Sequence, residues 1–269
     1  MKNYALKTPI IQNFDMKYYV HNNEDIIKPL IFPPHLHDEL EIYFLIEGDV
    51  SFMVEQNLYK LNSGDIIITK PNEIHNCILN SSTVHKHFCF WFDISCDFLF
   101  KSFTEHEFGK DNLIRLEENA KKEILSICNK IHESSIKEDK QGEFIYSSQL
   151  IYLLSKKVYY AKQTVIPSNL QKILDYINQN FVEIESIDSL ANMFFISRST
   201  LCRLFSNYLH TSPKLYLETK RLANSRKLLK YGKSVFDACI ESGFPDYSNY
   251  IRLFKKRFGI TPKQYKDSN

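Results

Sequence analysis

The sequence predicts two domains, an all-β barrel or sandwich with helices after it and then an all-α domain. A chain of 269 residues is long enough for two domains that each bury a core. Between residues 31 and 93, short aromatic and β-branched runs alternate with turn signals, which is typical of strands. After about residue 117 the apolar residues recur with a helical period, and after Ser168 the whole sequence has this character.

Three runs in the N-terminal part are expected to be strands joined by turns. Residues 41–46, 50–54 and 66–69 are rich in β-branched and aromatic side chains, which fit a pleated and buried surface. Gly48 and residues 62–65 separate these runs, because Gly, Asn and Ser favour turns. A β-sandwich or barrel follows from several such strands in sequence.

Two helices are expected after the barrel. One apolar stripe contains Ile124 and Ile131. A second stripe contains Leu150, Leu153, Leu154 and Val158, and it packs either on a second copy of the chain or on the barrel itself. An interdomain linker is expected just before Ser168, because a proline disfavours helix in the preceding residue. The expected domains are a barrel at 1–110, a helical dimerisation segment at 111–163, a linker at 164–167 and an all-α domain at 168–269.

The composition argues against several classes of protein. The N-terminus lacks the apolar segment of a signal peptide, and no run of about 18 apolar residues occurs. We therefore expect a cytoplasmic protein that does not enter a membrane. The six cysteines form no C-x-x-C pair, and the seven glycines form no phosphate-binding loop. Zinc knuckles, redox motifs and the common nucleotide enzymes are thus disfavoured, and no cofactor is expected.

The charge is distributed unevenly along the chain. Residues 168–269 carry 16 Lys and Arg against 9 Asp and Glu, a net charge of +7. Residues 1–167 carry 18 against 23, a net charge of −5, and the two parts add to the +2 of the whole chain. A basic half joined to an acidic half suggests that one part binds a polyanion. Chance variation in solvated surface charge is the alternative.

The C-terminal part contains two helix-turn-helix patterns about 48 residues apart. In the first, Ser186 caps a short helix that contains Ala191, and Ser197 caps a second helix. In the second, Ser234 begins the short helix and Gly243 allows the turn that follows it. A small residue in the short helix is needed because the two helices cross closely. Each pattern predicts one recognition helix for a DNA major groove.

A longer helix is expected to join the two units. It begins at Ser212-Pro213 and continues to about Leu229. At about 1.5 Å per residue, roughly 17 residues span about 26 Å. Major-groove segments on one face of B-DNA repeat about every 34 Å, so one chain is expected to read two of them.

This part of the sequence resembles the AraC/XylS family of bacterial regulators over about 100 residues. It departs from the family at His210, where glycine is usual, and His210 is expected to strain the turn after the first recognition helix. Ser225 and Tyr250 replace the usual alanine and phenylalanine. The resemblance implies double-stranded DNA with promoter half-sites and RNA polymerase as partners, a homodimer, and activation of transcription. The matching residues are Ser197, Leu201, Arg203 and Phe205, Ser212-Pro213, Arg221-Leu222 with Leu228-Leu229, and the run from Gly243 to Pro262.

The resemblance also implies contacts between each recognition helix and the edges of DNA bases. Arg203 and Arg252 are the strongest candidates, because an arginine can donate two hydrogen bonds to O6 and N7 of guanine. The alternative for each is a contact to a phosphate or to an acidic neighbour. Lys255, Lys256 and Arg257 are expected to contact the DNA backbone or to stay solvated. The expected DNA-binding residues are Arg198, Ser199, Cys202, Arg203, Tyr247, Ser248, Ile251, Arg252, Lys255 and Lys256.

The densest polar group of the barrel is formed by His35, His37 and Glu41. On one strand these three residues have the same parity, so their side chains are expected on the same side, toward the barrel interior. His75 is expected on a later strand. The arrangement resembles the cupin motif H-x-H-x3-E-x6-G with a later histidine, and so implies an all-β cupin-like barrel in the N-terminal domain.

Three interpretations of this group remain open. Cupin-like domains joined to such DNA-binding domains resemble sensors of small molecules, often sugars, which favours an effector pocket. Purely structural polar residues are the second interpretation. A site for Fe, Mn, Ni or Zn is the third, and it would make the barrel a metal-dependent cupin enzyme. Pro29, Glu73 and Leu79 depart from the cupin pattern and argue against the metal. The expected effector-binding residues are His35, His37, Glu41, His75 and Trp91, and His85 and His87 either join them or are edge residues.

The sequence as a whole predicts a sequence-specific transcription regulator and not an enzyme. An N-terminal cupin-like barrel with helices carries the effector pocket, and an all-α tandem helix-turn-helix domain binds DNA. Effector binding is expected to change how the helices at residues 117–162 pair or dock, and so to change which DNA half-sites are bridged.

Overall fold

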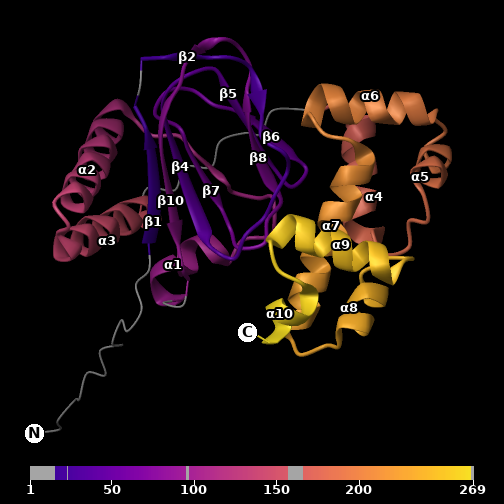
Figure 1. Cartoon of the computed structure of the whole chain (residues 1–269). Coiled ribbons are helices and arrows are strands. Elements are labelled where there is room, and N and C mark those ends of the chain that lie inside the picture. The colour runs from indigo at the N-terminus through magenta and orange to yellow at the C-terminus, as the bar shows by residue number, and fades with distance from the viewer. Residues whose placement is uncertain (1–15, 23, 95–96, 157–165, 268–269) are drawn as a thin grey trace, which may run out of the picture.

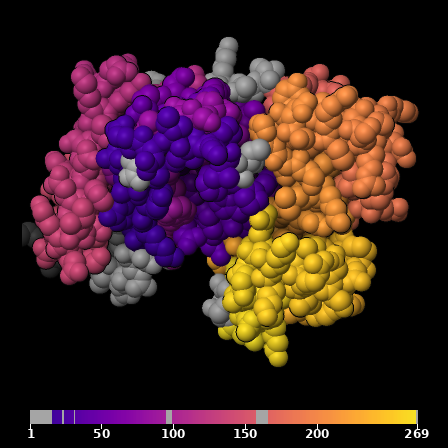
Figure 2. All heavy atoms as spheres, turned by 45° about the horizontal axis from the view of Figure 1, so that its top comes forward, coloured from indigo at the N-terminus to yellow at the C-terminus, as the bar shows by residue number. Residues whose placement is uncertain are grey.

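The computed structural model describes residues 16–22, 24–94, 97–156 and 166–267. It confirms the expected fold class, because a sheet-rich domain is followed by a helical domain. Figure 1 shows the sheets in the middle of the molecule, with helices α2 and α3 on one side and the C-terminal helices on the other. The space-filling view gives the same order of three layers (Figure 2).

The N-terminal domain contains two larger antiparallel sheets that face each other. The five-stranded sheet has the order β1-β10-β4-β7-β11, and the four-stranded sheet has the order β3-β8-β5-β6. Strands β2 and β9 form a separate pair. The strands are β1 (Met16–His21), β2 (Ile26–Ile27), β3 (Leu30–Ile31), β4 (Leu40–Glu47), β5 (Val50–Val54), β6 (Asn57–Lys60), β7 (Ile66–Thr69), β8 (His75–Leu79), β9 (Thr83–Val84), β10 (Lys86–Phe92) and β11 (Leu113–Ile114).

Alternate residues of the five-stranded sheet pack in opposite directions. Ile42 and Phe44 of β4 face helices α2 and α3, whereas Tyr43 and Leu45, which alternate with them, face the four-stranded sheet. Both faces of this sheet are therefore covered, and β4 is buried along most of its length. This explains why its sequence is nearly continuous in apolar residues and does not alternate with polar ones.

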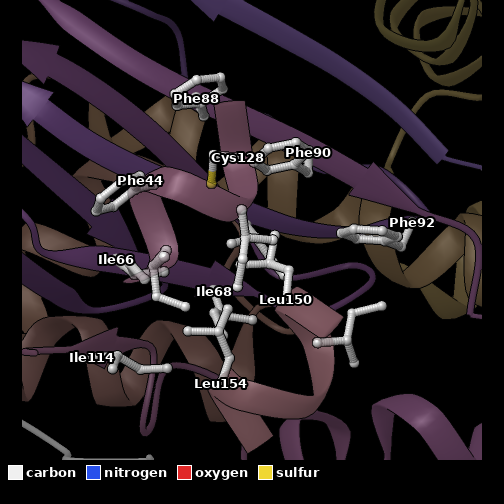
Figure 3. Packing of buried hydrophobic residues seen from close by; sticks show 14 of the residues in the cluster. Phe44, Ile66, Ile68, Phe88, Phe90, Phe92, Ile114, Cys128, Leu150 and Leu154 are labelled. Atoms are coloured by element: carbon white, nitrogen blue, oxygen red, sulfur yellow. The ribbon is translucent and has the colours of Figure 1, made fainter. Parts of the chain in front are cut away.

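In the part of the N-terminal domain that the structure describes there are three helices, α1 (Asp97–Thr104), α2 (Glu118–Ile136) and α3 (Lys140–Lys156). Leu150 and Leu154 of α3 are buried against the sheet, in the same apolar cluster as the phenylalanines of β10 (Figure 3). The interpretation of this stripe as a dimer seam is thus wrong for these two residues, which pack within the chain. Leu153 packs at the edge of the same cluster, and Val158 lies outside the described residues.

Several elements of this domain were not expected from the sequence, and strands β1 and β2 among them precede the expected range of 31–93. Helix α1 follows β10, and strand β11 pairs with β7 beyond the domain boundary expected at residue 110. Half of the expected linker, residues 164 and 165, lies outside the described residues, and Ile166 is buried among the C-terminal helices. Within the ranges that the structure describes, no helix combines the length and the apolar character needed to cross a bilayer.

The C-terminal domain consists of seven helices in the described residues, and their starts confirm the expected caps. As expected, the side chains of Ser186, Ser197, Ser212 and Ser234 each accept a hydrogen bond from a backbone N–H three residues later. Asp246, which was not expected as a cap, does the same before α9. The helices are α4 (Ser168–Asn180), α5 (Ile187–Met193), α6 (Arg198–Leu209), α7 (Pro213–Lys230), α8 (Val235–Glu241), α9 (Tyr247–Phe258) and α10 (Pro262–Asp267).

Helices α5 and α6 form the first helix-turn-helix unit, and α8 and α9 form the second, with α7 between them (Figure 1). Ala191 and Ala238 are buried at matching positions of the two short helices, as the close crossing requires. Gly243 has a φ of +79°, and a Cβ atom there would lie 2.5 Å from the carbonyl oxygen of Val182. The second turn therefore accepts only glycine.

Candidate effector site and DNA-reading surface

The structure brings together the four polar residues of the barrel that the sequence singled out. One ligand atom from each of His35, His37, Glu41 and His75 lies within 4.8 Å of the others. The expectation that they share one strand is wrong, because residues 35 to 41 are not one regular strand. His35 forms an isolated bridge with His75, a bend follows at residues 38 and 39, and only Glu41 belongs to β4.

Pro33 and Pro34 account for part of this irregularity. Neither residue has a backbone N–H, so the chain before His35 cannot continue a regular ladder. His35 N donates to His75 O, and His75 N donates to His35 O, both at 2.9 Å. The two imidazole rings consequently lie close together, with centroids 4.3 Å apart.

Glu41 is the centre of the hydrogen bonding in this group. Its Oε2 atom lies 2.9 Å from Nε2 of His37 and 3.3 Å from Nε2 of His75, and it accepts a hydrogen bond from Nε1 of Trp91 at 2.9 Å. Burial alone would raise the pKa of Glu41, but the hydrogen bonds from His37 and His75 hold this pKa well below its ordinary value. Burial lowers the pKa of His75, but the Glu41 carboxylate raises it, and on balance this pKa lies above its ordinary value. The site thus contains a buried ionised carboxylate.

The backbone fixes the orientation of two imidazole rings. Nδ1 of His37 lies 3.0 Å from the carbonyl oxygen of Glu39, and Nδ1 of His75 lies 2.9 Å from that of Glu73. Because a carbonyl only accepts, each Nδ1 carries the proton, and each Nε2 is directed at Glu41. Nitrogen and carboxylate donors in this orientation also fit a transition metal, which would take the Nε2 atoms as ligands.

A cavity of about 360 Å³ extends from this group between the two sheets. Of the five expected effector-binding residues, His35, Glu41 and Trp91 line it, whereas His37 and His75 do not. His85 and His87 also line it. Among the described residues that line this cavity there is no lysine or arginine. Apart from any protonated imidazole, Glu41 therefore carries the only formal charge among these described lining residues.

The histidines on the far side of the cavity are neutral at neutral pH. Burial, together with the neighbouring imidazoles, lowers the pKa of His85 to about 4 and that of His87 to about 3. The rings of His85 and His87 stack at 4.4 Å, and the hydroxyl of Tyr43 lies 2.7 Å from Nε2 of His85. Within the described ranges, Nε2 of His21 and Nδ1 of His87 are buried without a hydrogen-bond partner.

Sequence reasoning missed Tyr43 and His21 as lining residues. Strand parity could have identified Tyr43, because it pairs with Cys89, and His87, Cys89 and Trp91 alternate along β10 toward the same face. His21 pairs with His87 across β1 and β10, which no local pattern indicates.

The recognition helices α6 and α9 present most of the residues expected to bind DNA to solvent. Arg203 and Arg252 are both exposed, and Arg252 donates to Oδ1 of Asn249 at 2.7 Å. Arg198 is exposed and forms an ion pair with Asp188 at 2.9 Å. The other exposed residues of the set are Ser199, Tyr247, Ser248, Lys255 and Lys256, whereas Cys202 and Ile251 are partly buried.

Arg257 differs from the expectation that it contacts DNA or stays solvated. It is partly buried, and its guanidinium donates to the carbonyl oxygen of Pro34 in the barrel and, at 2.9 Å, to Oγ1 of Thr219. Its position near the end of α9 directs it away from the side that carries Arg252, toward the N-terminal domain. Arg257 therefore joins the two domains.

Comparison with known proteins agrees with both halves of the structure. Residues 190–268 match the family model described as a helix-turn-helix domain, and residues 30–155 match the one described as an AraC-like ligand binding domain. The regulator YdeC of Bacillus subtilis, described as an uncharacterized HTH-type transcriptional regulator, is 24% identical over 257 residues, which are 88% of this chain and 87% of YdeC. YbfI of the same species, described likewise, is 24% identical and covers 81% of each chain.

Among solved structures, ToxT from Vibrio cholerae is similar with a TM-score of 0.38 and 17% identity, over 94% of this chain and 97% of that one. The two family models together match most of the chain, one in each domain. Their order agrees with the fold, in which the barrel precedes the two helix-turn-helix units. The chain belongs to the AraC-type family of helix-turn-helix transcriptional regulators.

Proposed function

We propose that the chain activates transcription when a small neutral compound, such as a sugar, occupies the barrel cavity. The observation that carries the choice of compound is the lining of the cavity, which combines Glu41 with neutral imidazoles and contains no described lysine or arginine. An anionic compound would lose its hydration without gaining a countercharge. Hydroxyl groups can instead donate to Glu41 and to the imidazoles, and the ring of Trp91 can stack on the apolar face of a sugar.

The effector is tested by thermal unfolding in the presence of single compounds. Neutral sugars are expected to raise the melting temperature of the wild type and not that of Glu41→Gln, because a bound ligand stabilises only the folded state. The matching sugar acids serve as controls of the same shape with an added negative charge. Stabilisation by the acids alone would contradict the proposal.

DNA reading is proposed for the exposed faces of α6 and α9, with Arg203 and Arg252 in the main role. Both side chains are exposed at matching places on the two helices, so their loss should leave the fold intact. A mobility-shift titration against the region upstream of the gene compares the wild type with Arg203→Ala and Arg252→Ala. Unchanged affinity and sequence preference in both variants would refute the two assignments.

A homodimer is proposed, with a different surface from the one first expected. Ile145 and Tyr152 of α3 are 57% and 60% exposed and lie two turns apart on the outer side of the helix. Large apolar side chains in such positions are typical of an interface. Sedimentation of the wild type should show a dimer, and Ile145→Glu should shift it to the monomer. Contact with RNA polymerase is proposed from the family alone and is tested by transcription in vitro with the purified enzyme.

A metal-dependent activity of the barrel is the second candidate function. The observation in its favour is the cluster of His35, His37, Glu41 and His75, whose donor atoms fit Fe, Mn, Ni or Zn. A bound metal would supply a Lewis acid, and these four residues would hold it in place. Metal analysis of the purified protein separates the two functions. One transition metal per chain, lost in His37→Ala, would favour this candidate.

A further inference from the structure

The wall of the barrel between the cavity and the C-terminal domain is one residue thick. Three residues of this wall face the cavity or its histidine cluster, and the residue beside each one is buried in the apolar cluster of α4, α5 and α6. The arrangement follows from the alternation of side chains in extended chain. The three pairs are His35 with Leu36, Phe52 with Met53, and His75 with Ile74.

The segment from Pro34 to Asp38 is the most polar part of this wall. Its odd residues, His35 and His37, belong to the histidine cluster. Its even residues contact the C-terminal domain, since Pro34 O accepts from Arg257 and Asp38 accepts from Arg226 at 2.6 Å. Asp38 also accepts from the hydroxyl of Tyr265 at 3.2 Å.

Arg226 links this segment to a second loop of the wall. Besides Asp38, it donates to Oδ1 of Asn72 at 2.5 Å, and the backbone N–H of Asn72 donates to the carbonyl oxygen of His37 at 2.8 Å. Arg226 is 5% exposed, and its guanidinium lies 5.0 Å from the ring centroid of Phe258 in α9. A buried arginine of α7 thus holds both the histidine-bearing segment and the second helix-turn-helix unit.

We propose that residues 34–38 transmit occupancy of the cavity to the second helix-turn-helix unit, through Arg226 and Arg257. This inference rests on the proposed function, because it assigns the regulation of the same cavity. A ligand that displaces His35 or His37 also displaces Pro34 and Asp38, which are adjacent in the chain. The contacts of Arg226, Arg257 and Tyr265 then differ between the occupied and the empty state, as any coupling of two sites requires.

The partners on the other side of the wall decide which unit responds. Arg257 belongs to α9, Tyr265 to α10, and Arg226 to the part of α7 that packs on them. The contacts are hydrogen bonds and ion pairs, whose polar groups can exchange their partners for water. The second unit is therefore attached to the barrel by contacts that a ligand can alter.

The first test changes one domain and measures the other by amide hydrogen exchange, without DNA or ligand. Arg226→Met in the C-terminal domain should speed exchange at His35, Asn72 and His75 by about tenfold, the ratio expected when one charged hydrogen bond of about 1.4 kcal/mol is lost. Asp38→Ala in the barrel should likewise speed exchange at the amides of α10. This second variant tests the proposal even if Arg226→Met does not fold.

The control breaks another contact across the same interface. Oε1 of Gln56 accepts from the side chain of Asn178 at 3.0 Å, and neither residue belongs to the segment 34–38. Gln56→Ala should leave exchange at His35 and Asn72 unchanged. Equal effects of Gln56→Ala and Arg226→Met, or no effect of Arg226→Met and Asp38→Ala, would overturn the proposal.

The second test uses Trp91, the only tryptophan of the chain, whose Nε1 donates to Glu41 in the site. A duplex of the upstream region should change Trp91 emission in the wild type and in Gln56→Ala, because coupling between two sites is reciprocal. Asp38→Ala should bind the duplex without this change. If the wild type binds the duplex and Trp91 emission stays constant, the inference is overturned. If no variant binds the duplex, the proposed function is refuted, and the hydrogen-exchange test alone decides the inference.

Discussion

The two helix-turn-helix units have the same helices and the same kind of caps, but they are attached to the barrel in different ways. The core of the first unit, around Phe205, is one apolar cluster with Met53 and Ile74 of the barrel. The core of the second unit, around Phe254, closes within the C-terminal domain. Apolar surface cannot leave its partner without being exposed to water, whereas polar contacts can be exchanged. The first unit is thus fixed to the barrel, and the second is held by replaceable contacts.

The largest expected effect comes from emptying each core. Phe205→Ala and Phe254→Ala should each lower the free energy of unfolding by about 3–5 kcal/mol, because both rings are fully buried. Phe205→Ala should also destabilise the barrel, with which it shares a cluster. Urea unfolding followed by Trp91 emission reports the barrel, and circular dichroism reports all helices. The midpoint of the Trp91 transition should shift to a lower urea concentration in Phe205→Ala and should not shift in Phe254→Ala. Equal shifts in both variants would contradict the comparison.

The second comparison concerns the C-terminal ends of the two recognition helices. The last turn of α9 contains Lys255, Lys256 and Arg257, whereas the last turn of α6 has no basic residue. Replacing Lys255 and Lys256 by Gln should lower the slope of log affinity against log salt by about two, with equal loss on all sequences. Arg203→Ala should instead cost about 1–3 kcal/mol on the specific site alone. Binding isotherms at several salt concentrations distinguish these effects, and a salt slope unchanged in the Lys variant would exclude phosphate contacts.

The pH dependence of stability should arise mainly in the barrel. His85 and His87 titrate with a pKa of about 4 and about 3 when folded and near 6.5 when unfolded, so the unfolded chain binds more protons between these values. The free energy of unfolding should therefore fall as the pH falls from 6.5 toward 4, by at most about 1.4 kcal/mol per pH unit for each imidazole. The raised pKa of His75 acts with the opposite sign, since its stabilisation is present below 6.5 and is lost as the pH rises through the folded value.

Replacement of both histidines by Gln should reduce this slope without abolishing it, because burial also lowers the pKa of His35 to about 4. Denaturation followed by Trp91 emission is measured from about pH 4.5 to about pH 7, which covers about two pH units below the unfolded pKa of about 6.5. It gives the slope of the free energy of unfolding against pH in the two proteins. If the slopes are equal, His85 and His87 are not its source.

The smallest effects are expected at the C-caps of the two recognition helices. His210 after α6 has a φ of 50°, and Gly259 after α9 has a φ of 77°, both in the left-handed region. His210→Gly should raise the free energy of unfolding by up to about 1 kcal/mol, and Gly259→Ala should lower it by about 1–2 kcal/mol. No described atom lies within 4 Å of the added Cβ at Gly259, so the cost is conformational alone. Thermal unfolding of both variants checks the signs, and a higher melting temperature for Gly259→Ala would contradict the expectation.

The barrel site shows how far local pattern can predict a site. His35, His37, Glu41 and His75 were identified from their spacing, and the structure places them together. Their expected common strand was wrong, because the bend at residues 38 and 39 depends on contacts of His37 with Glu39 and Asn72 that no spacing specifies.

The sequence by itself determined the order of the two domains, the helix starts and the residues of the histidine cluster. These depend on neighbours within a few residues, such as a serine that caps the N–H three positions later. Only the tertiary structure decided that Arg226 and Asp38 meet across the wall and that α3 packs its leucines on the sheet. In the sequence such residues look like ordinary surface charges and an ordinary apolar stripe. Their partners lie far away in the chain, and only docking of the domains selects which surface each one meets.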